Sequence, residues 1–167
     1  KEFVIEKGRL VGVRFQKMTE VGIDTRGRPR LEPSGEEMVV ECRGQWCEYR
    51  MFFVWQEDLG ALYFSCLFDM KIPAGKRPMV SELLAMINER LWLGHFDLSS
   101  EEMSPMYRHT VLLRGTSGIA AEQLEDLLET AIGECERFYP AFQFALWGGK
   151  KPHEAMEAAM LAPVAVS

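Results

Sequence analysis

The sequence lacks the short motifs that mark most nucleotide-binding and metal-binding sites. It contains no GxxxxGK[ST] or GxGxxG run that would hold phosphate, and no CxxC pair that would hold zinc. No uncharged apolar run approaches the roughly 18 residues of a membrane span, and charges interrupt every apolar run of residues 1–18, unlike in a signal peptide. We therefore expect a cytoplasmic protein with no cofactor, no metal and no membrane contact.

Composition and charge indicate an ordinary folded chain with an unusual start. The 167 residues are 47% hydrophobic and carry a net charge of -6, which suits one domain with a sizeable core. Residues 1–36 hold 8 basic and 6 acidic side chains, whereas residues 37–167 hold 11 basic and 19 acidic. We predict an N-terminal strand and basic loop segment (1–36), a folded domain (37–161) and a frayed tail (162–167).

The basic segment suggests a nucleic-acid contact as one alternative function. Arg26, Arg28 and Arg30 lie close together in a loop rich in glycine and proline, and arginines of this kind can contact phosphate. The acidic remainder of the chain would repel nucleic acid. We therefore expect a solvated loop here and no nucleic-acid partner.

Hydrophobic periodicity predicts an α+β fold. Strands are expected at 37–42, 46–56 and 61–70 as an antiparallel meander, and Cys47, Tyr49, Met51, Phe53 and Trp55 alternate onto one face of the second strand. The other predicted elements are a helix at 77–93 stopped by Gly94, strands at 96–98 and 105–114, a helix at 120–148 kinked or split at Pro140, and a helix at 152–161. The result is a twisted antiparallel β-sheet of about five strands, order β-β-β-α-β-β-α, packed against helices.

Candidate catalytic groups are present but follow no recognisable pattern. Cys47 with His95 or His109 could form a thiol nucleophile and base, and Asp97, Glu101 and Glu102, with Glu57 and Asp58, could pair as acid and base. No glycine-rich turn or oxyanion-hole signature accompanies them, so we expect no enzyme. A small hydrolase with a His/carboxylate site is the alternative. We read Asp69 and Asn88 as structural hydrogen-bonding residues.

Aromatic side chains are the more informative feature. Eight of the 18 aromatic residues fall within residues 46–68, more than one helix and one sheet face would easily cover. Part of this surplus is expected to form a protein-binding groove or a dimer interface, although a well-filled core remains the alternative. The candidate residues are Trp46, Tyr49, Phe53, Trp55, Tyr63, Trp92, Phe142 and Trp147.

Four segments together resemble the YbjN-domain family of bacterial sensory transduction regulators. They are QWCEYRMFFVWQEDLGALYFSCLFDM (45–70), LLAMINERLWLGHFDL (83–98), HTVLLRG (109–115) and EQLEDLLETAIGECERFYPAFQFALWGGKKPHEA (122–155). The resemblance covers about residues 37–161 and implies a fold similar to type III secretion chaperones, often dimeric. Family members usually begin with an amphipathic helix, from which the strand and basic loop of residues 1–36 depart.

The sequence and the resemblance together lead to one functional expectation. We expect a non-catalytic protein-binding module, chaperone-like or a regulatory adaptor in bacterial signalling or stress response. We expect it to be a homodimer that can also bind an apolar segment of another protein.

Overall fold

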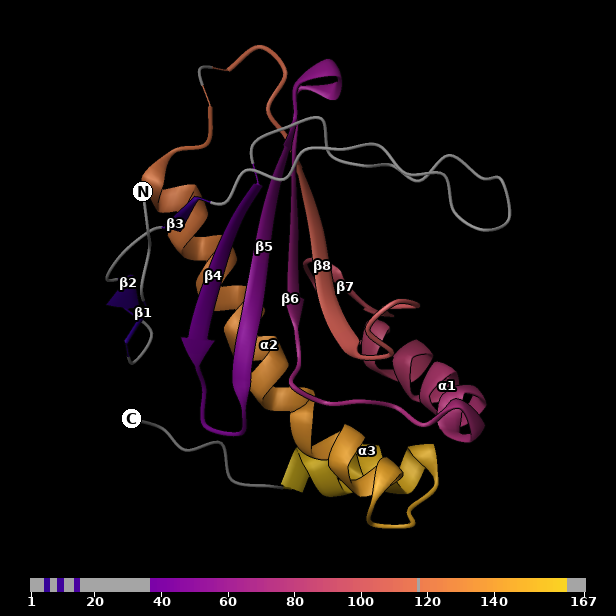
Figure 1. Ribbon diagram of the computed structural model, residues 1–167. Helices are drawn as coiled ribbons and strands as arrows, with labels where there is room; N and C mark the ends of the chain where they lie inside the picture. The colour runs from indigo at the N-terminus through magenta and orange to yellow at the C-terminus, as the bar shows by residue number, and fades with distance from the viewer. Residues whose placement is uncertain (1–4, 7–8, 11–13, 16–36, 117, 162–167) are drawn as a thin grey trace.

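The computed structural model describes residues 5–6, 9–10, 14–15, 37–116 and 118–161 (Figure 1). The predicted basic loop and the predicted frayed tail lie outside these residues. Five strands of four residues or more form the sheet: β4 (Glu37–Arg43), β5 (Glu48–Gln56), β6 (Ala61–Leu67), β7 (His95–Leu98) and β8 (Pro105–Leu112). Three α-helices accompany them: α1 (Arg77–Asn88), α2 (Ala121–Leu146) and α3 (Pro152–Leu161). The predicted α+β fold class is therefore confirmed.

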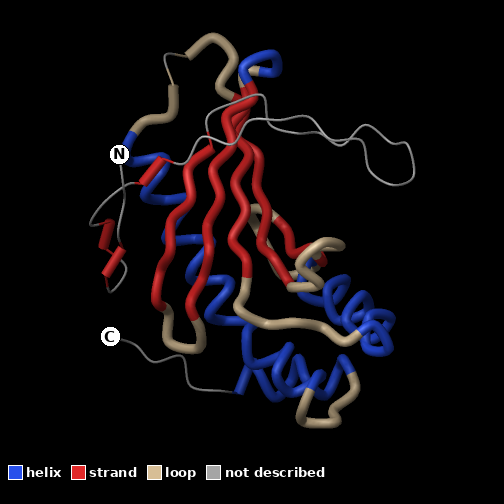
Figure 2. Tube along the Cα trace, in the orientation of Figure 1, coloured by secondary structure: helices blue, strands red, loops and turns tan. Residues whose placement is uncertain are grey.

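The sheet is a meander with one excursion. Strands β4, β5 and β6 pair antiparallel in sequence order, then β6 pairs with β8, and β7 pairs with β8 at the edge (Figure 2). Three two-residue strands are described in the N-terminal segment, β1 (Ile5–Glu6), β2 (Arg9–Leu10) and β3 (Arg14–Phe15), and β1 and β3 pair along the edge of β4. The order of the five longer strands and of the helices is the one that periodicity predicts.

One face of the sheet, called the inner face below, packs against α2, which lies behind the strands in Figure 1. Aromatic rings from both layers meet there edge to face. The ring centroids of Phe96 and Phe138 are 6.0 Å apart, and those of Phe68 and Phe142 are 5.5 Å apart. Such pairs add to the stabilisation that burial alone provides, so this layer is the core of the molecule.

The first long helix is shorter than predicted. Helix α1 carries Pro78 in its first turn and buries Val80, Leu83, Leu84 and Ile87, but it ends at Asn88. Gly94 is therefore not its C-terminal stop. Gly94 has φ +66°, and a Cβ there would overlap the ring and hydroxyl of Tyr107, which donates a 2.8 Å hydrogen bond to Leu93 O. The glycine is needed for this close approach.

The long C-terminal helix is not split. Helix α2 runs from Ala121 to Leu146 with Pro140 inside it, and Pro140 is buried. The cost of the missing N–H at this position is offset by tertiary packing, because ten further residues of α2 are buried as well. Among the helices of the described ranges, none combines the length and apolar character that a membrane crossing needs.

Candidate functional site

The predicted thiol nucleophile lies in surroundings that keep it protonated. Burial raises the pKa of the Cys47 thiol to about 11, so that the thiolate is scarce near neutral pH. The groups that act on Cys47 are Asp69, Tyr49, Cys66 and Glu136, and no imidazole is among them. Burial and, to a smaller extent, the neighbouring His95 lower the pKa of His109. The structure does not bring together a Cys–His pair.

All four cysteines gather on the inner face without forming a metal site. Cys66 and Cys135 are fully buried and in hydrogen-bonding contact, and Cys66 is also close enough to Cys42 and Cys47 to contribute to their raised pKa values. All four are free thiols. Within residues 37–116 and 118–161, no group of three or more metal-ligating side chains is arranged to hold an ion. The cluster therefore behaves as part of the core.

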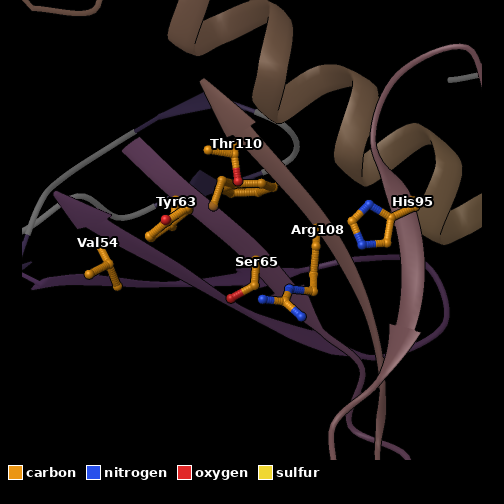
Figure 3. Close-up of a pocket in the computed structure, with 7 residues that line it drawn as sticks. Val54, Tyr63, Ser65, His95, Arg108 and Thr110 are labelled. Carbon is orange, nitrogen blue, oxygen red and sulfur yellow. The ribbon is translucent and has the colours of Figure 1, made fainter. Parts of the chain in front are cut away.

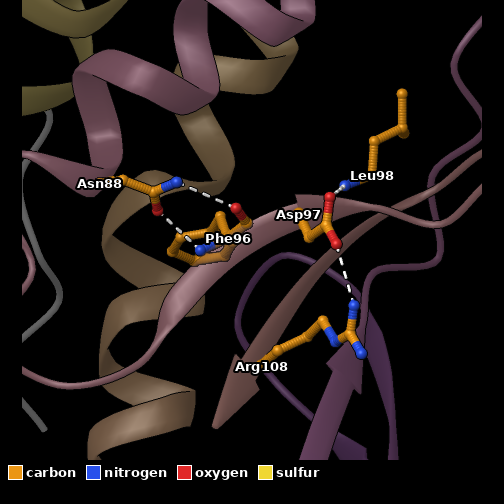
Figure 4. A network of polar contacts seen from close by, with 5 residues as sticks. All are labelled: Asn88, Phe96, Asp97, Leu98 and Arg108. Carbon is orange, nitrogen blue, oxygen red and sulfur yellow. Dashed lines mark hydrogen bonds and ion pairs between the residues drawn. The ribbon is translucent and has the colours of Figure 1, made fainter.

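The candidate carboxylates are divided among different contacts. Asp97 accepts a hydrogen bond at 3.0 Å from Nη1 of Arg108 (Figure 4), and Glu102 lies 3.7 Å from Arg50. These are exposed ion pairs and not an acid and base facing one substrate. Asp69 is exposed, and its backbone is in hydrogen-bonding contact with the Cys47 thiol.

Asn88 has the predicted structural role. Its Nδ2 donates to Phe96 O at 3.0 Å, and its Oδ1 accepts from Phe96 N–H at 2.7 Å (Figure 4). Both hydrogen-bonding groups of one backbone residue of β7 are thus satisfied by a single side chain at the end of α1. The pair fixes the edge strand to the helix.

The eight aromatic candidates are spread over several environments. Tyr49, Phe53 and Phe142 lie in the core with at most 3% of their surface exposed. Trp46 stacks on Tyr139 with ring centroids 6.2 Å apart, and Trp55 and Tyr63 are half-buried. Trp92 and Trp147 are 77% and 62% exposed, the first after α1 and the second after α2. Core members of this set cannot also line a surface groove of the same chain.

The opposite face of the sheet, called the outer face below, presents apolar side chains as well. Alternation along β5 places Phe52 and Val54 on this side, because their neighbours Met51 and Phe53 are buried on the inner side. Val54 pairs with Tyr63 of β6, and both are half-buried. In Figure 1 the described helices lie behind or below the sheet, so that none of them covers the outer face. A mixed apolar and polar surface therefore faces away from the core.

A pocket of about 220 Å³ opens on the outer face (Figure 3). Its walls come from four strands that are brought side by side by the sheet pairing. Arg108 of β8 lies opposite Ser65 on one side and His95 on the other, while Thr110 lies opposite Tyr63. The lining residues are Val54, Tyr63, Phe64, Ser65, His95, Arg108 and Thr110. Only Tyr63 among them was predicted as a binding residue.

Comparisons with known proteins agree with the resemblance seen in the sequence. The family model of YbjN, described as "Putative bacterial sensory transduction regulator", matches residues 29–144, which is more than half of the chain. The match includes every strand and helix from β4 to β8 and nearly all of α2. No curated protein and no solved structure matches this chain. The likeness to type III secretion chaperones thus stays a prediction.

Proposed function

We propose that this chain, which belongs to the YbjN family, is a non-catalytic regulatory module that binds another protein through the outer face of its sheet. The regulatory character accords with the description of the family. The four free thiols suit a reducing compartment, and a cytoplasmic location is part of the proposal.

The outer face carries this proposal. The strands β5, β6 and β8 bury one side against α2 and present Phe52, Val54 and Tyr63 on the other, beside the pocket. Contiguous apolar surface rimmed by polar groups is typical of protein-binding sites. The hydrolase alternative receives less support, because the Cys47 thiol is held protonated and the acids lie in separate ion pairs.

The predicted homodimer is a competing occupant of this surface. A second copy would bury the outer face by packing sheet against sheet. We favour an apolar segment of another protein, in keeping with an adaptor role. Light scattering on the purified chain separates the two occupants, because a dimer that dissociates when Phe52 is replaced by alanine would assign the face to a second copy.

Site-specific photo-crosslinking in a bacterium that naturally makes this protein tests the proposal. A photoreactive phenylalanine at Phe52 probes the outer face, and the same group at Glu125, which is exposed on α2, is the matched control. We expect one recurrent heterologous adduct from position 52 and none from position 125. The partner identified by the crosslink is then purified and titrated with this chain. Phe52→Ala should weaken the affinity for the partner about tenfold or more, and Trp147→Ala should leave that affinity unchanged. Equal adducts from both positions would refute the outer face as the binding surface.

A further inference from the structure

We propose that the pocket on the outer face receives a single carboxylate side chain from the docked protein segment and that Arg108 is its main contact. This inference rests on the proposed function and names the chemistry of the partner. It commits to an aspartate or glutamate in an otherwise apolar segment.

The register of the sheet places the donors of the pocket in one row. Ser65, Arg108 and His95 occupy directly opposed positions on β6, β8 and β7. Thr110 follows two residues after Arg108, so that its side chain lies on the same side of β8. Figure 3 shows the Ser65 hydroxyl and the Arg108 guanidinium on one side of these strands. A group that enters the pocket thus meets several donors together.

The lining is rich in donors and contains no acid. It includes one permanent cation, Arg108, together with an imidazole and three hydroxyl groups. The remaining members are Val54, which is apolar, and Phe64, whose ring lies in the inner aromatic layer. A carboxylate only accepts hydrogen bonds, so it is the side-chain group that complements this set best. Val54 provides an apolar contact for the methylene groups of the same side chain. Charge complementarity therefore selects an acidic residue over a basic or neutral one.

Arg108 keeps binding capacity in the present structure. It donates through Nη1 to Oδ2 of Asp97 at 3.0 Å, whereas a guanidinium has five N–H donors arranged as a planar fork. Asp97 is held in place independently, because its Oδ1 accepts the N–H of Leu98 at 2.8 Å. Asp97 therefore orients the guanidinium from one side, and a second carboxylate can approach from the pocket.

Size and net charge narrow the ligand further. A volume of about 220 Å³ is below the roughly 300–1,000 Å³ of pockets that hold drug-sized molecules, and it suits one amino-acid side chain. The whole chain carries a net charge of -6 and repels strongly acidic partners at long range. The pocket therefore favours a lone acidic residue among apolar ones and disfavours an acidic tract.

Phenylacetate and its neutral isostere phenylacetamide are the probes for this chemistry. In a titration of the ¹⁵N-labelled full chain, phenylacetate should shift the amide signals of Ser65, His95 and Thr110 saturably, with an affinity at least about fivefold higher than that of phenylacetamide. Arg108→Gln should abolish the difference between the probes. Arg43 is an exposed arginine on β4, several strands away from the pocket, and Arg43→Gln should preserve the difference between the probes. Absence of binding, or equal binding of both probes to the unmodified protein, would overturn the inference.

Binding of the crosslinked partner by two variants tests this inference separately from the proposed function on which it rests. Arg108→Gln should weaken partner binding about tenfold, while the thermal unfolding midpoint of this variant stays near that of the unmodified chain. If Phe52→Ala weakens binding and Arg108→Gln does not, the carboxylate inference is wrong and the binding face stands. If neither variant changes the affinity, the proposed function is wrong as well.

Discussion

The two faces of one sheet differ in what they do for the molecule. Phe52 and Phe53 are neighbours in β5, yet Phe53 is 3% exposed on the inner face, and Phe52 is only half-buried on the outer face. On the inner face, Phe53 lies 4.9 Å from Phe64 between ring centroids, within a continuous aromatic layer. The difference indicates that the inner face provides stability, and it leaves the outer face as the surface on which we propose recognition.

The largest expected effect tests this division directly. Phe53→Ala should lower the free energy of unfolding by about 3–5 kcal/mol, because it leaves a cavity in a packed layer. Phe52→Ala should cost about 1 kcal/mol or less, since solvent and neighbouring side chains fill the space. Urea denaturation of both variants gives the comparison. Similar losses for the two phenylalanines would mean that the outer face is packed in the same way as the core.

Much of the inner face was predictable from local sequence, and the outer face was not. The alternation from Cys47 to Trp55 shows which side of β5 is buried. Apolar residues at helical spacing in residues 80–87 likewise mark the side that α1 buries, because apolar and polar positions contrast there. Phe52 and Val54 remove that contrast at one end of β5. Of the eight aromatic residues predicted to bind, Tyr49, Phe53 and Phe142 are core, whereas Tyr63 lines the pocket on the outer face.

The pocket could not be found from sequence for a topological reason. Its row of donors depends on the pairing of Ser65 with Arg108, two residues that are separated by all of α1 and β7. The signal that could have been used is the alternation in β8, where Tyr107 turns inward and Arg108 outward. A lone arginine in a strand reads as an ordinary solvent-facing residue until its neighbours are known.

The edge strand provides a second test of the inner side. Asn88→Ala should cost about 2 kcal/mol, because it removes both hydrogen bonds to Phe96 and leaves partly buried backbone groups unpaired. Ser81→Ala is the matched control on the same helix, since its exposed hydroxyl bonds only Arg77 O, and it should change stability by less than about 0.5 kcal/mol. Hydrogen exchange at Phe96 N–H should be faster in Asn88→Ala and unchanged in Ser81→Ala. An unchanged rate there would contradict the anchoring role of Asn88.

Alkaline pH should lower the stability of the protein through the buried thiols of the inner face. Burial raises the pKa of Cys42 and of Cys47 to about 11 from an ordinary value of 9.0. The unfolded chain therefore loses these protons first, and stability that is complete below pH 9 falls as the pH rises toward 11. The midpoint of urea unfolding should fall over this range, and the double variant Cys42→Ala, Cys47→Ala should show a shallower fall. Ser65→Ala on the outer face removes no titrating group and should keep the full slope.

The smallest expected effect concerns the ion pair of the outer face. Asp97 and Arg108 are about half exposed, with side-chain exposures of 46% and 49%, and exposed pairs of this kind contribute about 0–1 kcal/mol. Asp97→Asn should therefore lower stability by less than about 1 kcal/mol, and 1 M salt should erase most of the difference. The amide oxygen can still accept the Leu98 N–H, so the charge alone is tested. A loss above about 2 kcal/mol that persists in salt would show that the ion pair of Arg108 stabilises the fold. The outer face would then contribute to stability as the inner face does, and the contrast between the two faces would not hold for Arg108. A small, salt-sensitive loss means that the same arginine can exchange partners at little cost, as a recognition surface requires.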